Sequence, residues 1–217
     1  MPSHDEHVAQ VSSAVRAFFE NGQPLHIFHG STNSTRPVDH SRIVDISCLS
    51  NVLKVNPSST TALVEPNVPM DKLVQATLSH GLVPRVVMEF PGITVGGGFA
   101  GSAGESSSFR YGYFDQTVRS IEVVLAEGQT ITASSTENAD FFKGATGSLG
   151  TLGVITKLEL RLIPASYFVK LVYHPYSTIH ETIKASKQET ENPDNDYVDG
   201  IIFSRVHGVV MTGQLIN

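Results

Sequence analysis

Hydrophobic positions recur at helical spacing near the start of the chain and in short runs after it. Between residues 8 and 19 the apolar side chains fall every three or four positions, which predicts an amphipathic helix. A second helix is predicted from Pro69, a residue favoured in the first turn, to a stop at Gly81. A strand is predicted for the short apolar run at residues 25–28. Further strands are predicted for the runs rich in β-branched residues, which are typical of strands, at residues 42–46, 52–55 and 60–66.

The second half of the chain alternates apolar and polar positions more regularly. Residues 118–133 read as two strands around a turn at residues 127–129, which predicts a hairpin. A short helix is predicted over residues 138–145. Three leucines alternate with charged residues over 157–162, as expected of a half-buried antiparallel strand.

The pattern changes after Pro164 and predicts the beginning of a second domain. A strand over residues 167–176, a helix over 177–188 and a further strand or hairpin over 198–215 are expected there. The chain stops in the last of these before such a domain could close. A strand edge left open at that point favours aggregation, so we expect the chain to be a fragment or a truncated form.

Composition and charge narrow the class of protein. The chain has 217 residues, 40% of them hydrophobic, a net charge of −6 and a single cysteine. Scattered Lys and Arg give no basic stripe for nucleic acid, and one cysteine excludes an internal disulfide. No stretch approaches the roughly 20 apolar residues of a membrane span, and the polar start does not resemble a signal peptide. We expect an intracellular α+β protein, cytoplasmic or peripherally bound to a membrane; the oligomeric state is not predicted.

A run of small residues, "FPGITVGGGFAGSAGESSSFRYG", matches the dinucleotide fingerprint by its letters. Gly96, Gly98 and Gly101 satisfy G-x-G-x-x-G, and Glu122 follows about 20 residues later. The fingerprint requires a helix directly after the glycines, so that the pyrophosphate lies at its N-terminus. The residues that follow Gly101 show no helical period, and Glu122 lies in a predicted strand. We therefore reject a Rossmann site.

Three further motifs are considered as an anion-binding loop, a metal site and a hydrolase nucleophile. The segment Gly30–Arg36 combines glycine, hydroxyls and one cation, so an anion-binding loop and an ordinary polar turn both remain possible. The His pairs His4/His7 and His26/His29 are not joined by further ligands at metal-binding spacing, so no metal site is predicted. Ser148 does not lie in the G-x-S-x-G pattern of a nucleophile elbow and has no accompanying His–Asp pattern, so no hydrolase is predicted.

The order of these segments resembles that of a known family. "HIFHGSTNSTR", the small-residue run, the hairpin and "ADFFKGATGSLGTLGVITKLELRLIPA" follow one another within Val8–Ala165. This order is similar to the FAD-binding domain of the vanillyl-alcohol oxidase / p-cresol methylhydroxylase (PCMH) superfamily. "TVGGGFAGSAGESSSFRYG", "IPASYFVKLVYHP" and "DGIIFSRVHGVVMTG" resemble the delta-24 sterol reductases, the Diminuto group.

The resemblance implies a fold and a cofactor site. The fold would be a PCMH-type α+β domain of two subdomains gripping FAD, residues 1–165, followed by the beginning of a cap domain, residues 166–217. Many members of the superfamily attach the flavin to a histidine; here Thr32 falls at that place, so non-covalent FAD is expected. No catalytic residue is assigned, because it would lie on the cap. The implied cofactor-binding residues are Gly30, Ser31, Thr32, Asn33, Ser34, Thr35, Thr94, Val95, Gly96, Gly97, Gly98, Phe99, Ala100, Gly101, Ser102, Ala103, Gly104, Glu105, Ser106, Gly150, Thr151, Gly153, Val154 and Ile155.

The resemblance also implies an activity. It would be reduction of a sterol side-chain (delta-24) double bond by an FAD-dependent oxidoreductase, with NADPH as electron donor. Two alternatives stay open: an FAD-dependent oxidase of small alcohols or sugars, and a non-catalytic flavin-binding fragment. The reductases of animals and plants carry a membrane anchor upstream of this region, and no transmembrane segment is predicted in this chain. Glu105 is expected to be structural, because its carboxylate would repel a pyrophosphate unless it accepted backbone hydrogen bonds.

Overall fold

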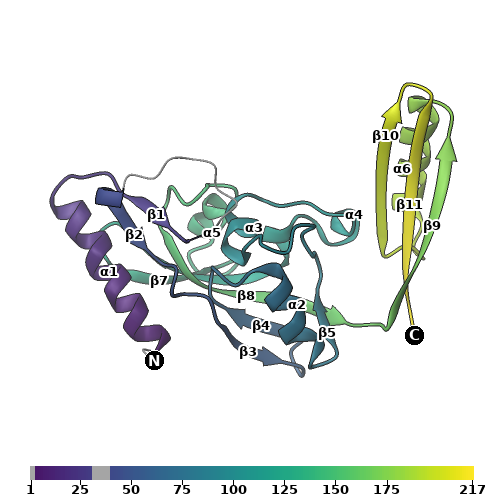
Figure 1. Cartoon of the computed structure of the whole chain (residues 1–217). Helices are drawn as coiled ribbons and strands as arrows, with labels where there is room; N and C mark the ends of the chain where they lie inside the picture. Colours follow the sequence, from purple (N-terminus) through teal and green to yellow (C-terminus); the bar gives the residue numbers. More distant parts are fainter. Residues whose placement is uncertain (1–2, 31–39) are drawn as a thin grey trace.

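Two structural units of unequal size make up the chain (Figure 1). The computed structural model describes residues 3–30 and 40–217. The larger unit ends with the strand β8 (Val154–Pro164), and the smaller one begins with β9 (Phe168–Tyr176). The predicted boundary at residue 165 therefore falls in the short connection between these two strands.

A six-stranded antiparallel sheet forms the frame of the larger unit. Its strands lie in the order β3-β4-β8-β6-β7, with β5 also paired to β8. The predicted hairpin over residues 118–133 is confirmed by β6 and β7, and the leucine alternation is confirmed by β8, in which every second residue from Val154 to Leu162 is buried. The strand bounds are β3 (Val52–Asn56), β4 (Thr61–Val64), β5 (Leu82–Pro84), β6 (Val118–Val124) and β7 (Thr130–Ser134).

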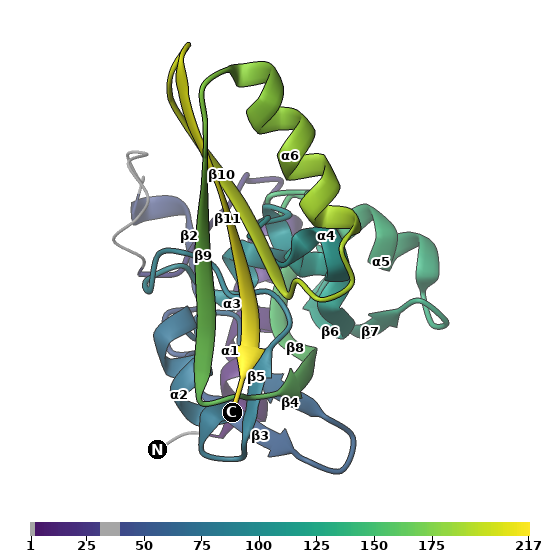
Figure 2. The ribbon, with the colours of Figure 1, turned by 90° about the vertical axis from the view of Figure 1, so that its right-hand side faces the viewer.

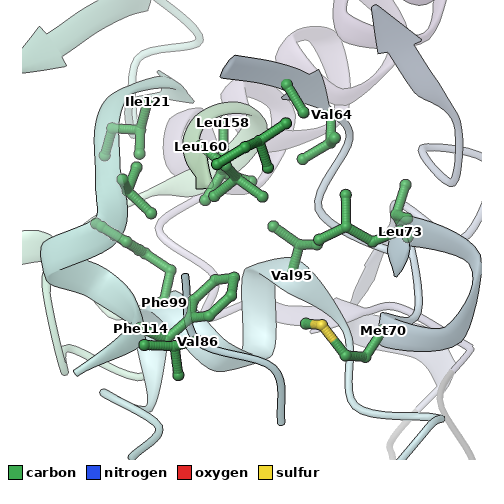
Figure 3. Packing of buried hydrophobic residues seen from close by; sticks show 14 of the residues in the cluster. Val64, Met70, Leu73, Val86, Val95, Phe99, Phe114, Ile121, Leu158 and Leu160 are labelled. Atoms are coloured by element: carbon green, nitrogen blue, oxygen red, sulfur yellow. The ribbon is translucent and has the colours of Figure 1, made fainter. Parts of the chain in front are cut away.

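Helices cover one face of this sheet and build the main core there. The predicted second helix is α2 (Met70–Leu78), and α3 (Val95–Ala100) lies beside it. Figure 3 shows Val95 and Phe99 of α3 among the buried side chains of α2 and β8. Three short elements complete this side: α4 (Ser108–Tyr111), η2 (Phe114–Thr117) and α5 (Ala139–Ala145), the last confirming the helix predicted over 138–145.

The first helix and a small parallel sheet form a second core. Helix α1 (His4–Glu20) buries Val8, Val11 and Val15 against residues that include Val124 of β6, which confirms the predicted amphipathic helix. Strand β1 (His26–Phe28) pairs in parallel with β2 (Ile43–Asp45), which follows η1 (His40–Arg42). Strand β1 leads directly into the segment that begins at Gly30, and Ile27 of β1 packs in the same core as α1. The packing of α1 therefore helps to set the position at which that segment begins.

A polar network fastens the beginning of α1 to the sheet. Nδ1 of His4 lies 2.8 Å from Oε1 of Glu65, and its Nε2 lies 3.0 Å from Oε1 of Glu122. Glu65 is fully buried and also accepts hydrogen bonds from the backbone and side-chain nitrogens of Asn51. Glu122 accepts from Lys157 and from the hydroxyl of Thr156. Together these contacts join the first turn of α1 to Glu65 and to strand β6.

Protonation of Glu122 should loosen this network in acid. Burial alone would raise the pKa of Glu122, but hydrogen bonds from Lys157, His4 and Thr156 outweigh it and hold the pKa below its ordinary value of 4.5. Since the folded-state pKa is depressed, the stabilisation is present above 4.5 and is lost as the pH falls below it. We predict that Glu122→Gln lowers the urea midpoint at neutral pH and that its difference from the wild type shrinks between about pH 5 and 3. A difference that stayed constant over this range would contradict the assignment.

The smaller unit is a three-stranded antiparallel sheet with one helix. Strands β10 (Tyr197–Ser204), β11 (His207–Ile216) and β9 lie in the order β10-β11-β9, and α6 (Ile179–Glu191) packs on one face. Its small core contains Ala185, Val198 and Val210. The predicted strand, helix and hairpin are all present. No helix in the described part of the chain is long and apolar enough to span a membrane.

Candidate functional site

Three segments were predicted to form a cofactor site, and the structure describes two of them fully. Of the first segment only Gly30 is described; it is exposed and has a φ of +67°. Ser31, Thr32, Asn33, Ser34 and Thr35 lie outside the described residues, as does Arg36. The choice between an anion-binding loop and a polar turn is therefore left to experiment.

The second segment contains a helix that the sequence did not predict. The family resemblance implied that Thr94–Ser106 would be a cofactor-binding loop, but residues Val95–Ala100 form α3. The physical reason is that Thr94 caps the helix, its Oγ1 accepting from the amide of Gly97, while Val95 and Phe99 bury one face. The Rossmann interpretation remains excluded, because Gly96 and Gly98 lie inside this short helix and do not precede one.

Most amides of α3 and its ends are already used within the protein. The amide of Val95 donates to the carbonyl of Val68, and that of Gly96 donates to the carbonyl of Pro66. A Cβ added at Gly96 would lie 2.8 Å from Cβ of Pro66, so this glycine permits close packing against the chain itself. These glycines therefore serve packing, and the surface that this segment offers to a ligand consists of the exposed Gly97, Gly101 and Gly104.

The third segment is a glycine turn after α5, and it contacts both the end of α3 and the strand β1. The amide of Leu149 donates to the carbonyl of Ala100 at 3.0 Å, which ties the turn to the end of α3. A Cβ added at Gly147 would lie 3.1 Å from Oγ of Ser102, and one added at Gly150 would lie 3.0 Å from Cδ1 of Ile27 in β1. The end of α3, the end of β1 and this turn thus converge at one place.

Left-handed backbone conformations cluster where these segments meet. Ser102 and Leu149 have φ values of +49° and +53°, which L-residues rarely adopt. Gly147 and Gly150 have φ values of +67° and +79°. Successive amides in such conformations form concave anion-binding nests, and strained non-glycine residues concentrate at functional sites.

The donors and side chains at this place fit a dinucleotide flavin. Among the described residues, the backbone amides of Gly147 and Gly150 donate no hydrogen bond to a protein acceptor. Amides of this kind can hold a diphosphate, and the small residues around them let it approach closely. The side chains of Leu149 and Leu152 are exposed beside them and offer apolar contact to a flat ring. The residues present thus suit FAD.

The predicted site residues divide by exposure. Side chains in the core cannot touch a ligand: Val95, Phe99 and Val154 are buried, as is the backbone of Gly98. The half-buried residues are Thr94, Gly96, Ala100, Ser102, Ala103, Glu105, Ser106, Gly150, Gly153 and Ile155, and the exposed ones are Gly30, Gly97, Gly101, Gly104 and Thr151. Sequence reasoning missed Gly147 and Leu149; the glycine cluster signalled the first, whereas nothing in the sequence signals the left-handed backbone of the second.

Glu105 has the structural role expected of it. Its Oε1 accepts from the backbone amide of Glu89 at 2.8 Å, and its own amide donates to Oγ of Ser108. Ser107 is buried and donates to the carbonyl of Arg85. These contacts join Arg85 and Glu89, which precede the small-residue run, to Glu105 and Ser107 at its end.

A cleft in the described part of the chain lies apart from these segments. It has a volume of about 480 Å³ and is bounded by η2, α5 and β8. It contains none of the predicted site residues, and its walls mix the cations Arg119 and Arg161 with the carboxylates Asp115 and Asp140. We therefore do not place the flavin there.

Comparison with known proteins decides the family. The sequence profile described as "FAD binding domain" matches residues 5–134, more than half of the chain. The chain belongs to this family. FAD is thus the cofactor that the family binds, the predicted α+β FAD-binding fold is shown, and the converging glycine segments are its candidate site.

Curated relatives of the chain are named as reductases and as a dehydrogenase. The Delta(24)-sterol reductase of Macaca fascicularis is 31% identical over 219 residues, covering 98% of this chain and 42% of that protein. The Delta(24)-sterol reductase of Pisum sativum is 34% identical over 194 residues, covering 82% of this chain and 34% of that protein. Cytokinin dehydrogenase 4 of Oryza sativa subsp. japonica is 30% identical over 140 residues, covering 64% of this chain and 26% of that protein. The chain thus spans less than half of the length of these relatives.

Proposed function

We propose that this chain is the flavin-binding part of an FAD-dependent reductase that acts on a side-chain (delta-24) double bond of a sterol, with NADPH as reductant. The observation that carries the proposal is the similarity to Delta(24)-sterol reductases over 98% of the chain. The likeness extends through the smaller unit, beyond the residues matched by the family profile. That unit is the part of the chain in which we expect sterol specificity to begin.

The chain's own residues would bind and orient the cofactor. The amides of Gly147 and Gly150 would hold the diphosphate, with Gly97 and Gly101 leaving room on the other side. Leu149 and Leu152 would exclude water from one face of a bound ring. Bound FAD would supply the hydride chemistry, which is the cofactor's own.

FAD is expected to bind without a covalent link, because a threonine, Thr32, stands where superfamily members that attach the flavin carry a histidine. Acid precipitation of the loaded protein should therefore release the flavin into the supernatant. Flavin absorbance that stayed with the precipitate would contradict this prediction.

Anaerobic turnover tests the proposed reaction. The chain loaded with FAD, and a longer protein that contains it, would be mixed with NADPH and a delta-24 sterol. Bleaching of the flavin band by NADPH, its recovery on adding the sterol and a product heavier by two hydrogens would support the proposal. If NADPH reduced the flavin but no sterol reoxidised it, the proposal of a sterol substrate would be contradicted. The proposal that the chain binds FAD would still stand.

A dehydrogenase or oxidase of a small substrate is the second candidate, and the likeness to cytokinin dehydrogenase favours it. Such an enzyme would reduce its flavin with a small alcohol, sugar or amine in place of NADPH. Peroxide released during turnover in air would mark the oxidase. A protein that binds FAD but passes electrons to or from no substrate would be a non-catalytic flavin-binding fragment.

A further inference from the structure

The segment directly after the glycine run carries the contact between the two units. The carbonyl of Ser106 accepts from the amide of Val198 at 2.8 Å and so occupies part of the open edge of β10. Phe109 packs on the small core of Ala185, Val198 and Val210. We call residues 106–110 the docking segment. In Figure 2 α4, which contains the end of this segment, lies beside β10 and α6.

Arg110 makes the charged contact of this segment. Its guanidinium pairs with Oδ1 of Asp196 and donates to the carbonyl of Pro193 at 2.6 Å. The other carboxylate oxygen of Asp196 accepts from the amide of Leu215 in β11. Arg110 of the larger unit therefore holds the loop that leads into β10. Through Asp196 it also holds the end of β11. Burial raises the pKa of the neighbouring Tyr197, as do Asp196 and Tyr111, which is consistent with a closed contact.

The docking segment is rigidly joined to the candidate flavin site. The amide of Phe114 donates to the carbonyl of Ala103 at 2.8 Å, which closes residues 103–114 into one block. At one end of the block Ser102 lies against Gly147 of the site, and at the other end Arg110 holds the smaller unit. A ligand that moved Ser102 would therefore act on the docking contact through this one segment.

We propose that Arg110 is a positioning residue that holds the smaller unit against the flavin-binding unit, and that docking of this unit and binding of FAD strengthen each other. The coupling rests on the proposed FAD site. Such coupling is reciprocal: the factor by which docking raises FAD affinity equals the factor by which FAD favours docking. In the described part of the chain, neither Arg110 nor Asp196 contacts the converging segments, so their effect on FAD runs through the docking segment.

Two measurements on the whole chain test this proposal. Docking is read from the exchange rate of the Val198 amide, which is protected by Ser106, and FAD affinity is read by titration. The variants are Arg110→Ala and Arg110→Lys. Lysine keeps the positive charge but lacks the two guanidinium nitrogens that donate to Asp196 and to Pro193. Arg119→Ala is the matched control, because Arg119 pairs with Glu159 within the larger unit and is about half exposed.

The expected result is a graded loss in both measurements. Arg110→Ala should speed Val198 exchange by roughly tenfold and weaken FAD binding by about fivefold, at the lower end of typical couplings. Arg110→Lys should fall between it and the wild type, and Arg119→Ala should match the wild type. FAD should slow Val198 exchange in the wild type and have less effect in Arg110→Ala.

Other outcomes overturn the proposal in distinguishable ways. Unchanged Val198 exchange in Arg110→Ala would overturn the positioning role. Faster exchange with unchanged FAD affinity would overturn the coupling. A wild type that binds no FAD would contradict the proposed function and the coupling together, while the exchange rates would still decide the positioning role.

Discussion

Replacing Gly153 by alanine is expected to destabilise the fold and weaken FAD binding at least tenfold. A Cβ at this position would lie 2.7 Å from Cγ2 of Val123 and 2.9 Å from the carbonyl oxygen of Val124. Val123 is a fully buried, stiff side chain and Val124 contributes backbone, so neither can move aside. Overpacking of this kind costs about 1–3 kcal/mol. The strand β8 and the turn that carries Gly147 and Gly150 would have to shift.

The loss of affinity follows from the displaced turn. A hydrogen bond to a charged oxygen contributes roughly 1.5–3 kcal/mol, and every 1.4 kcal/mol corresponds to about tenfold in affinity. Urea unfolding and FAD titration measure the two effects. Gly200→Ala is the control, because its Cβ would meet only the carbonyl oxygen of Val209 at 3.7 Å, an ordinary contact far from the site. Gly153→Ala that behaved like Gly200→Ala would contradict the placement of the turn.

Removing the Glu65 carboxylate is expected to cost about 3 kcal/mol or more of unfolding free energy. Glu65→Ala would leave Nδ1 of His4 and both nitrogens of Asn51 without their acceptor, and would leave a cavity in the core. Leaving a buried donor without its hydrogen-bond partner typically costs about 1–3 kcal/mol, and several donors lose their partner at once here. Since a domain is stabilised by only about 5–15 kcal/mol in total, the beginning of α1 should detach well before global unfolding.

Glu159→Ala provides the comparison for this variant. Glu159 pairs with Arg119 at 3.3 Å on the partly exposed side of β8, where such pairs contribute about 0–1 kcal/mol. Urea midpoints of the two variants separate the buried from the exposed carboxylate. If Glu65→Ala lost no more stability than Glu159→Ala, the network would not be what holds α1 to the sheet.

Regular elements could be predicted because burial imposes a period on the sequence. The helix α1 shows its buried valines at three- and four-residue spacing, and β8 shows its buried leucines at every second position. The order of the glycine segments pointed to the family because each fills a fixed place in the fold. The family match bears out that interpretation.

Features that depend on tertiary contacts could not be predicted. Helix α3 forms in a glycine run only because Thr94 caps it and Val95 and Phe99 are covered by other elements. Glu65 gives no sign in the sequence that it is buried, because its partners His4 and Asn51 come from other segments. The left-handed backbone of Leu149 is likewise imposed by the turn around it.

The central claim is that the converging segments around Gly147 and Gly150 bind FAD. The most direct measurement is the absorbance spectrum of the purified chain, before and after titration with FAD, followed by the same titration of Gly150→Val. Gly150 has a φ of +79° and lies against Ile27, so a branched side chain there would close the meeting point of the segments. The account predicts one bound flavin per wild-type chain and little or none in the variant. A colourless wild-type chain that ignores added FAD, or a variant that binds FAD as well as the wild type, would contradict it.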